Sequence, residues 1–295
     1  MTSPTTRPTS GAIWMVLAAI ASVQVGAAVA KNLFGVVPPV TMAWLRIAAA
    51  AVALLLLTAL GRGRTRREAR RHPDQQAKPL SARSWPAGLA YATCLVGMNV
   101  SIYEAFARLP LGLAVTLEFL GPLGLSVVGS RRALDVMWAL LALAGVALLG
   151  FTPTGMDPWG VFFALLAGAC WAGYIVTAAR AGKTWPGMDA LTLACTIGAV
   201  VLAVPAIHQG GAQIVRPDVL LAGAGVGLLS SVVPYSLEMV ALKSIPPRVF
   251  GILMSIEPAA AALAALILLG ERLSPTDLLA MACVIVASIG ATRST

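Results

Sequence analysis

Two stretches of the chain, Leu117-Glu118-Phe119-Leu120-Gly121-Pro122 and Met254-Ser255-Ile256-Glu257-Pro258, each place a carboxylate and a proline inside a long apolar run. A charge at the centre of a bilayer costs at least about 2.5–3.5 kcal/mol, so an acid at that depth indicates a function. Proline deprives the carbonyl four residues earlier of its hydrogen bond, here that of Glu118 or Met254, and so kinks the helix. In lipid such a carbonyl must be satisfied by protein or water. We therefore expect helix kinks at Pro122 and Pro258, and an internal cavity that both stretches line.

The composition is that of a membrane protein. Apolar residues make up 58% of the 295-residue chain and charged residues 11%, whereas a soluble domain carries about 25% charged residues. The net charge of +9 would also suit a nucleic-acid-binding protein, but the basic residues lie in short segments between apolar runs, as in the loops of membrane proteins. We therefore expect the lipid bilayer as a partner, and no nucleic acid.

Ten apolar runs approach the ~20 residues that a membrane-spanning helix requires. They lie near residues 12–30, 38–60, 86–107, 111–130, 133–151, 158–179, 187–207, 217–241, 246–269 and 274–291. Residues 1–11 are polar and rich in Ser, Thr and Pro, and we expect a disordered tail there. Residues 61–84 are expected to form a basic loop, the longest connection. The sequence thus predicts an all-α membrane protein with ten transmembrane helices.

The distribution of Lys and Arg predicts the orientation of these helices. With a cytoplasmic N-terminus, sixteen of the 21 Lys and Arg residues fall on the cytoplasmic side and four on the other, while Arg46 lies within a span. An excess of basic residues marks the cytoplasmic side of a membrane protein. Both termini and the basic loop are therefore expected in the cytoplasm.

The chain contains an internal repeat. Landmarks recur at an offset of 136 or 147 residues: Leu109-Pro110 with Ile245-Pro246, Pro122 with Pro258, and Gln24-Val25-Gly26 with Trp171-Ala172-Gly173. Five helices in each half is an odd number, so the second copy must enter the membrane upside down. We expect two inverted five-helix repeats, residues 12–151 and 152–295. Inverted repeats are the architecture of secondary transporters, which bind substrate near the midplane between the repeats.

The sequence also resembles a known family. The motifs that carry the resemblance are Ala21-Ser22-Val23-Gln24, Ala30-Lys31, Pro110-Leu111-Gly112, Leu117-Glu118-Phe119, Gly121-Pro122-Leu123, Ser130-Arg131-Arg132, Gly168-Ala169-Cys170-Trp171-Ala172, Pro234-Tyr235-Ser236-Leu237-Glu238, Ile256-Glu257-Pro258-Ala259 and Gly270-Glu271. Over nearly the whole chain after the first ten residues, they resemble the EamA-type family of the drug/metabolite transporter superfamily, and within it the bacterial threonine/homoserine exporters. The resemblance implies proton-driven export of a small amino acid across the inner membrane. Glu104 departs from the family pattern.

Glu118 and Glu257 are the expected centre of the site. An amino-acid zwitterion needs an acceptor for its ammonium group, and either carboxylate can bind that group, exchange protons, or do both. Desolvation disfavours the charged form of a carboxyl group, so a carboxyl buried near the midplane can exchange protons near neutral pH. The alternative for both is a structural salt bridge or a hydrogen bond to a nearby serine. For Glu257 a structural role is equally open, because its motif is shared across EamA-type proteins.

Three further charged residues are candidates for a gate or a cavity mouth. Lys31 is seven residues from Gln24 and so shares its helix face; it either extends to the outer interface or contacts substrate. Arg46 either holds the substrate carboxylate or pairs with an acid. Glu238 either lines the inner mouth of the cavity or pairs with Lys243.

Polar and aromatic residues at helical spacing are candidates for the cavity wall and for substrate binding. They are Gln24, Asn99 with Tyr103, Trp171 with Tyr174, and Tyr235, which shares a helix face with Glu238. For the aromatic residues the alternative is ordinary helix packing. Glu104 and Arg108 are four residues apart, the spacing of a local ion pair.

Other functions find less support in the sequence. The four cysteines lie singly in separate apolar runs, and no spacing suggests a metal site, a redox pair or a cofactor. No H-E-x-x-H, P-loop or catalytic-triad pattern indicates an enzyme or an ATP-driven pump. Within the same fold the alternative is export of other amino acids or of cationic drugs, although 6% aromatic residues favours a small polar substrate. A passive channel is disfavoured by the paired kinks with acids. The sequence indicates no particular oligomeric state.

Overall fold

The computed structural model describes residues 10–71, 84–128, 133–149, 156–185, 188–242 and 244–294. Within these ranges all regular elements are helical and no strand occurs, which confirms the all-α class. In chain order the elements are α1 (Ser10–Asn32), α2 (Pro39–Arg71), α3 (Trp85–Phe106), α4 (Leu111–Glu118), α5 (Leu120–Val128), α6 (Ala133–Leu149), α7 (Pro158–Thr184), α8 (Asp189–Gly210), η3 (Gly211–Val215), α9 (Pro217–Gly227), η4 (Leu228–Val232), α10 (Val233–Ala241), α11 (Pro247–Met254), α12 (Glu257–Leu269) and α13 (Pro275–Ser294). Of the tail expected at residues 1–11, residues 1–9 lie outside the described residues. Residues 10 and 11 belong to α1.

Eight segments of the described chain are helical, long and apolar enough to cross a membrane. They are Gly11–Asn32, Pro39–Leu60, Trp85–Phe106, Pro158–Thr184, Asp189–Val215, Pro217–Glu238, Val249–Leu269 and Pro275–Arg293. Two shorter apolar segments, Leu111–Leu125 and Leu134–Leu148, lie where the fourth and fifth of the ten expected spans were placed. The chain is therefore a multi-pass membrane protein, with eight full-length spans and two shorter apolar helices among the described residues.

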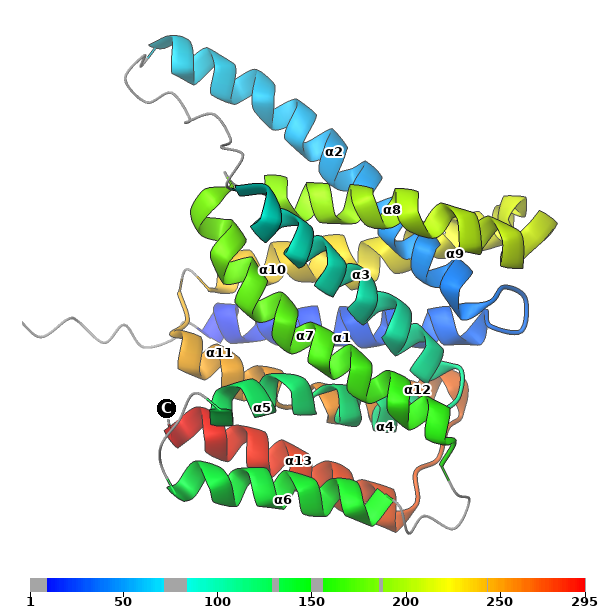
Figure 1. Ribbon diagram of the computed structural model, residues 1–295, viewed down its shortest axis with the longest axis vertical. Helices are drawn as coiled ribbons and strands as arrows, with labels where there is room; N and C mark the ends of the chain where they lie inside the picture. The colour runs from blue at the N-terminus through cyan, green and yellow to red at the C-terminus, as the bar shows by residue number, and fades with distance from the viewer. Residues whose placement is uncertain are drawn as a thin grey trace, which may run out of the picture.

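The prediction of a basic loop at residues 61–84 is wrong for its first half, because α2 continues to Arg71. Six of residues 61–71 are Arg, which favours helix and outweighs the two glycines, Gly61 and Gly63. Figure 1 shows this part of α2 extending beyond the bundle. The remainder of the expected loop, residues 72–83, lies outside the described part.

The two organising stretches do interrupt their helices. α4 ends at Glu118 and α11 ends at Met254, which are the residues four positions before Pro122 and Pro258. These are the carbonyls that each proline leaves without an amide donor, so the predicted kinks are confirmed.

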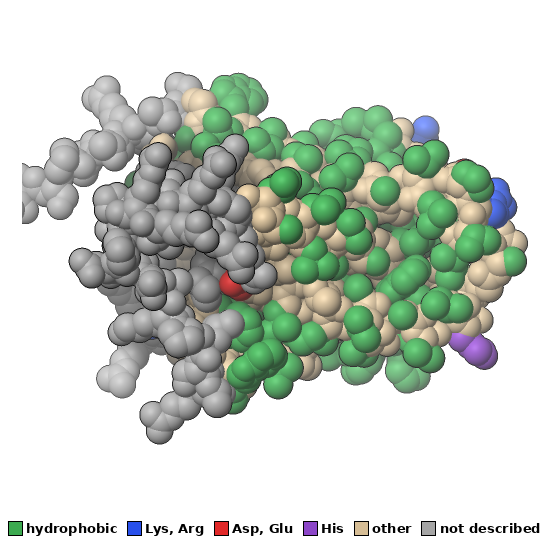
Figure 2. Space-filling view, turned by 90° about the horizontal axis from the view of Figure 1, so that it is seen from above, with side chains coloured by type: hydrophobic (Ala, Val, Ile, Leu, Met, Phe, Trp, Pro, Cys, Tyr) green, Lys and Arg blue, Asp and Glu red, His purple; other side chains and the backbone are tan. Residues whose placement is uncertain are grey.

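The helices form one bundle with two distinct ends. The start of α1 and the C-terminus of α13 lie at the same end, which we call the termini end, and the opposite end is called the far end (Figure 1). α6 packs along α13, α2 along α8, α3 along α7, α1 along α10 and α12, and α4 against α12. Figure 2 shows that the face between the ends carries mainly apolar side chains, while the visible Lys, Arg and His side chains lie at the far end. This surface suits an apolar solvent around the middle of the bundle.

The far end is closed by apolar packing. The main buried cluster contains residues next to its connections, including Val37, Met42, Phe106, Leu109 and Leu111. Many alanines of α1, α2 and α4 also belong to this cluster. Small side chains allow helix backbones to approach closely in a membrane, so this end has a tightly packed plug.

Candidate functional site

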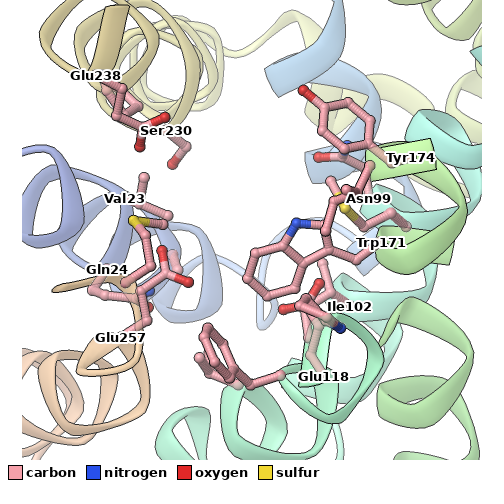
Figure 3. Close-up of a pocket in the computed structure, with 18 of the residues that line it drawn as sticks. Val23, Gln24, Asn99, Ile102, Glu118, Trp171, Tyr174, Ser230, Glu238 and Glu257 are labelled. Carbon is pink, nitrogen blue, oxygen red and sulfur yellow. The ribbon is translucent and has the colours of Figure 1, made fainter. Parts of the chain in front are cut away.

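A cavity of about 410 Å³ opens among the central helices. Figure 3 shows two walls that face each other across it, one carrying Gln24, Ser230, Glu238 and Glu257 and the other carrying Asn99, Glu118, Trp171 and Tyr174. The first wall comes from α1, η4, α10, α11 and α12, and the second wall comes from α3, α4, α5 and α7. The volume is within the range of small-ligand sites.

The two walls contain residues that stand at the repeat offsets seen in the sequence. Six such pairs line the cavity: Gln24 with Trp171, Ala27 with Tyr174, Met98 with Pro234, Ile102 with Glu238, Val115 with Gly251, and Glu118 with Met254. The cavity therefore lies between corresponding elements of the two halves. In three of these pairs a polar residue stands at the offset of an apolar or aromatic one, so the two walls differ in chemistry.

Glu118 and Glu257 both lie on the cavity, on opposite walls (Figure 3). Glu118 is the last residue of α4, directly at the kink, and Glu257 is the first residue of α12. Neither carboxylate has an ion pair or hydrogen bond with any residue that the structure describes. The salt bridge or serine contact considered from the sequence is thus not found within the described ranges. Apart from Arg46, which lines the same cavity, no described cation is there to offset these acids.

A close backbone contact holds the first kink in place. A Cβ added at Gly121 would collide with the carbonyl of Gly168 in α7, and one added at Gly168 would lie 2.6 Å from the carbonyl oxygen of Glu118. Only glycine at both positions lets the α7 backbone reach the kink. α7 therefore fixes the position of Glu118.

Arg46 lies on the cavity and contacts backbone and an aromatic ring. Its Nη2 donates to the carbonyl oxygen of Ser230 at 2.9 Å, and its guanidinium lies 5.9 Å from the ring centroid of Tyr103. Pro234 has no N–H to offer to the carbonyl four residues earlier, which is that of Ser230, so Arg46 supplies the missing donor. Among the ion pairs of described residues none involves Arg46. A guanidinium has five N–H donors, so it retains donors for a ligand.

The other predicted wall residues are placed as follows. Gln24 and Asn99 line the cavity, and Asn99 Nδ2 donates to the Leu95 carbonyl at 2.8 Å. The ring of Trp171 projects into the cavity (Figure 3) and packs edge-on against Phe119 at 5.4 Å.

Tyr174 and Glu238 also line the cavity. The ring of Tyr174 stacks on that of Tyr91 at 5.0 Å. Glu238 lies toward the termini end, and Lys243, its alternative partner, falls outside the described residues. Tyr235 lies in α10, but its side chain is also outside the described part.

Tyr103 and Lys31 do not line the cavity. Tyr103 is fully buried one turn beyond Asn99, where it packs against Phe34 at 6.0 Å and Phe106 at 5.8 Å. Its expected role as a wall residue is wrong, because four-residue spacing fixes the helix face but not the depth at which the cavity ends. Lys31 is held at the far end, away from the cavity lining.

Lys31 pairs with a residue that the sequence did not connect to it. Its Nζ lies 2.6 Å from Glu271 Oε1 and donates to the carbonyl oxygen of Leu109 at 2.6 Å. Glu271 Oε2 also accepts the backbone N–H of Leu111 at 2.8 Å. This network, which we call the far-end clamp, ties the end of α1 to the α3–α4 and α12–α13 connections. The predicted local pair Glu104–Arg108 is confirmed at 2.5 Å.

Ser230 is a cavity residue that sequence reasoning missed. It lies in η4, a π-helical turn between α9 and α10. The signal was present, because Pro234 frees the Ser230 carbonyl just as Pro122 frees that of Glu118. π-helical turns inside α-helices occur frequently at functional sites.

Comparison with known proteins gives close relatives over most of the chain. Residues 158–293 match the EamA-like transporter family. The threonine/homoserine exporter RhtA of Escherichia coli (strain K12) is 39% identical over 283 residues, which cover 95% of this chain and 90% of that protein. RhtA of Salmonella typhimurium is 38% identical over the same length. The uncharacterized transporter YwfM of Bacillus subtilis (strain 168) is 28% identical over 68% of this chain and 70% of that protein.

A solved crystal structure has the same fold, with a TM-score of 0.63 at 21% identity over 97% of both chains. The match to RhtA covers 95% of this chain and so extends through most of it. By this extent of identity the chain belongs to the EamA-like transporter family.

Proposed function

We propose that the chain is a secondary exporter of small amino acids of the threonine/homoserine class, driven by protons and working by alternating access. The observation that carries the proposal is the pair of partnerless carboxylates, Glu118 and Glu257, on one cavity with Arg46. A zwitterion offers one positive and one negative group, and this lining supplies opposite charges for both. The names of the RhtA relatives support the substrate class.

The charges on the cavity suggest how substrate and protons share the site. Arg46 is the basic residue on the described lining and is assigned to the substrate carboxylate, while Glu118 and Glu257 receive the ammonium group. When substrate leaves, an empty carboxylate in a desolvated site takes up a proton, because desolvation disfavours its charged form. Substrate and proton then compete for the same oxygens, so outward movement of one is linked to inward movement of the other.

Alternating access is supported by the arrangement of the helices. α6 and α2 each pack against the element that stands at the corresponding place in the second half, namely α13 and α8, and α4 packs against α12, which corresponds to α5. α3 packs along α7 just as the segment from α9 to α10 packs along α1. This exchange-symmetric pattern, together with the paired cavity residues, supports two inverted five-helix repeats within residues 12–151 and 152–295. Rocking of such repeats about a central site is the usual transport movement.

The structure has the form expected of a state open toward one side only. The lining reaches Glu238, Gly251 and Thr292 near the termini end, whereas the apolar plug and the far-end clamp close the other end. We assign the termini end to the cytoplasm from the basic-residue bias. In this reading the cavity receives substrate from the cytoplasm, Glu238 lies at the inner mouth, and Lys31 with Glu271 forms the outer gate.

Efflux from proteoliposomes tests the proposal. Vesicles are preloaded with labelled threonine or homoserine, and a proton gradient, acid outside, is imposed or omitted. We expect faster efflux with the gradient, because protons entering through the carrier drive substrate outward. Efflux of both amino acids at rates independent of the gradient would remove the proton coupling. No efflux of either from folded protein would favour the second candidate, export of other amino acids or cationic drugs.

A further inference from the structure

Two polar atoms of the first wall are buried and have no hydrogen-bond partner among the described residues: Gln24 Oε1 and Ser230 Oγ. Gln24 exposes 3% of its surface and Ser230 exposes 4%, and both line the cavity (Figure 3). A buried polar atom without a partner costs about 1–3 kcal/mol. Such atoms at a cavity indicate groups that a ligand satisfies.

The hydroxyl of Ser230 is unusual among the helical hydroxyls of this chain. Eight other Ser and Thr hydroxyls on helices, and that of Ser255 just after α11, donate to the carbonyl four residues earlier. That bond is the ordinary way for a helical hydroxyl to be satisfied in a membrane. Ser230 makes no such bond: its Oγ lies over Gly26 of α1 and is buried without a partner among the described residues.

The turn that carries Ser230 is held rigidly. In η4 the Val233 N–H bonds to the Leu228 carbonyl, five residues earlier, which leaves the Leu229 carbonyl without its usual donor. Ser22 Oγ of α1 satisfies that carbonyl at 2.6 Å, and Arg46 satisfies that of Ser230 at 2.9 Å. Both freed carbonyls are thus satisfied from neighbouring helices. The Ser230 hydroxyl is fixed in position without being used in the fold.

The surroundings of Ser230 favour a neutral polar ligand group over a carboxylate. Its carbonyl accepts one N–H of Arg46, whose remaining donors are assigned to the substrate carboxylate, and Glu238 lies beside Ser230 on the same wall (Figure 3). A ligand carboxylate next to Glu238 would be repelled, whereas a hydroxyl both donates and accepts and carries no charge. Gln24 Oε1 lies further along the wall toward Glu257 (Figure 3), where an acceptor suits the ammonium group.

We propose that Ser230 is a specificity-determining residue: its hydroxyl hydrogen-bonds the side-chain hydroxyl of the exported amino acid, while Gln24 accepts from its ammonium group. This inference rests on the proposed export of hydroxylated amino acids. A site built around a hydrogen bond to a substrate hydroxyl discriminates strongly against the analogue that lacks it, because its own polar group is then left unpaired. Threonine and homoserine both become L-2-aminobutyrate when the hydroxyl is removed, so one probe serves for both.

The test compares threonine, homoserine and L-2-aminobutyrate efflux in wild type, Ser230→Ala and Gln24→Leu, with Ser231→Ala as the control in the same turn. We expect Ser230→Ala to lower threonine and homoserine efflux at least about tenfold and to leave 2-aminobutyrate efflux within about twofold. Gln24→Leu should lower efflux of all three alike. Ser231→Ala should change none, because Ser231 does not line this cavity.

Thermal unfolding without substrate separates recognition from a structural role. Ser230→Ala removes no hydrogen bond of the described fold, so its melting temperature should equal or exceed that of wild type. A lower melting temperature, together with equal loss of all three substrates, would overturn the inference. So would a Ser230→Ala protein that exports threonine and 2-aminobutyrate as wild type does. If wild type exports none of the three, the proposed function itself fails; if it exports them without discriminating by the hydroxyl, only this inference fails.

Discussion

Replacing Glu271 by glutamine should shift the protein toward the state that is open at the far end. The carboxylate serves two partners in the clamp, Lys31 Nζ at 2.6 Å and the Leu111 N–H at 2.8 Å. The side chains of Lys31 and Glu271 expose only 18% and 20% of their surface. Glutamine carries no charge, and because the two partners use different oxygens of the carboxylate, its NH₂ group would face one of the two donors in this geometry. The substitution therefore weakens the closed state selectively, provided that the clamp parts when the far end opens.

The magnitude follows from the lost bond. A hydrogen bond to a charged group contributes about 1.5–3 kcal/mol. Because the pair is about one-fifth exposed, solvent screens part of this interaction. The closed state is therefore destabilised by on the order of 1–2 kcal/mol. Because about 1.4 kcal/mol is a factor of ten in population, the open fraction should rise roughly 5- to 30-fold.

Thiol labelling measures this fraction. In a background with the four native cysteines replaced by alanine, Val37→Cys reports opening, because Val37 lies in the apolar plug and exposes 1% of its surface. Its neighbour Val36 is 38% exposed, so Val36→Cys is the matched control that should label equally in every variant. In nanodiscs, Glu271→Gln should raise the labelling rate of Val37→Cys and not that of Val36→Cys. The gate would be refuted if Glu271→Gln changed the labelling rate of Val37→Cys by less than about twofold and Lys31→Gln also left that rate unchanged.

Three further predictions concern packing, charge and binding. Gly168→Ala should lower the melting temperature, because overpacking against the Glu118 carbonyl destabilises the fold by about 1–3 kcal/mol. The control Gly124→Ala adds a Cβ that meets nothing within 4 Å, so it should raise the melting temperature or leave it unchanged. Equal melting curves for the two variants would contradict the proposed backbone contact. Arg46→Lys should raise the KM for threonine about tenfold, because the single ammonium group of lysine cannot replace the several N–H donors that a guanidinium directs at the Ser230 carbonyl and a carboxylate together. An unchanged KM would exclude Arg46 as the carboxylate partner. Threonine at about 100 times its Kd should stabilise the folded protein by about 2.7 kcal/mol, and no stabilisation by threonine or homoserine in a thermal scan would count against their binding here.

Local chemistry made the central features predictable. The kinks at Glu118 and Met254 follow from a single rule about the carbonyl that precedes a proline by four residues. The presence of Glu118 and Glu257 on a cavity follows from the cost of an acid in lipid. The same rule, applied at Pro234, would have identified Ser230 as well.

The features that were mispredicted depend on distance along or between helices. α2 passes the end of its apolar run because the arginines of residues 61–71 favour helix although they are not apolar. Tyr103 shares a face with Asn99 but lies one turn deeper, inside the plug instead of the cavity. The Lys31–Glu271 pair joins opposite ends of the sequence, and no periodicity within one helix can indicate it.

The measurement that tests the central claim most directly is proton movement during amino-acid transport. A pH-sensitive dye is trapped in proteoliposomes whose voltage is clamped, and threonine is added outside, for wild type, Glu118→Gln and Glu257→Gln. Antiport predicts that threonine entry through wild type moves protons out and makes the interior more alkaline, and that Glu118→Gln abolishes this change. Threonine entry with no change in internal pH in wild type, or an undiminished change in both variants, would contradict the account.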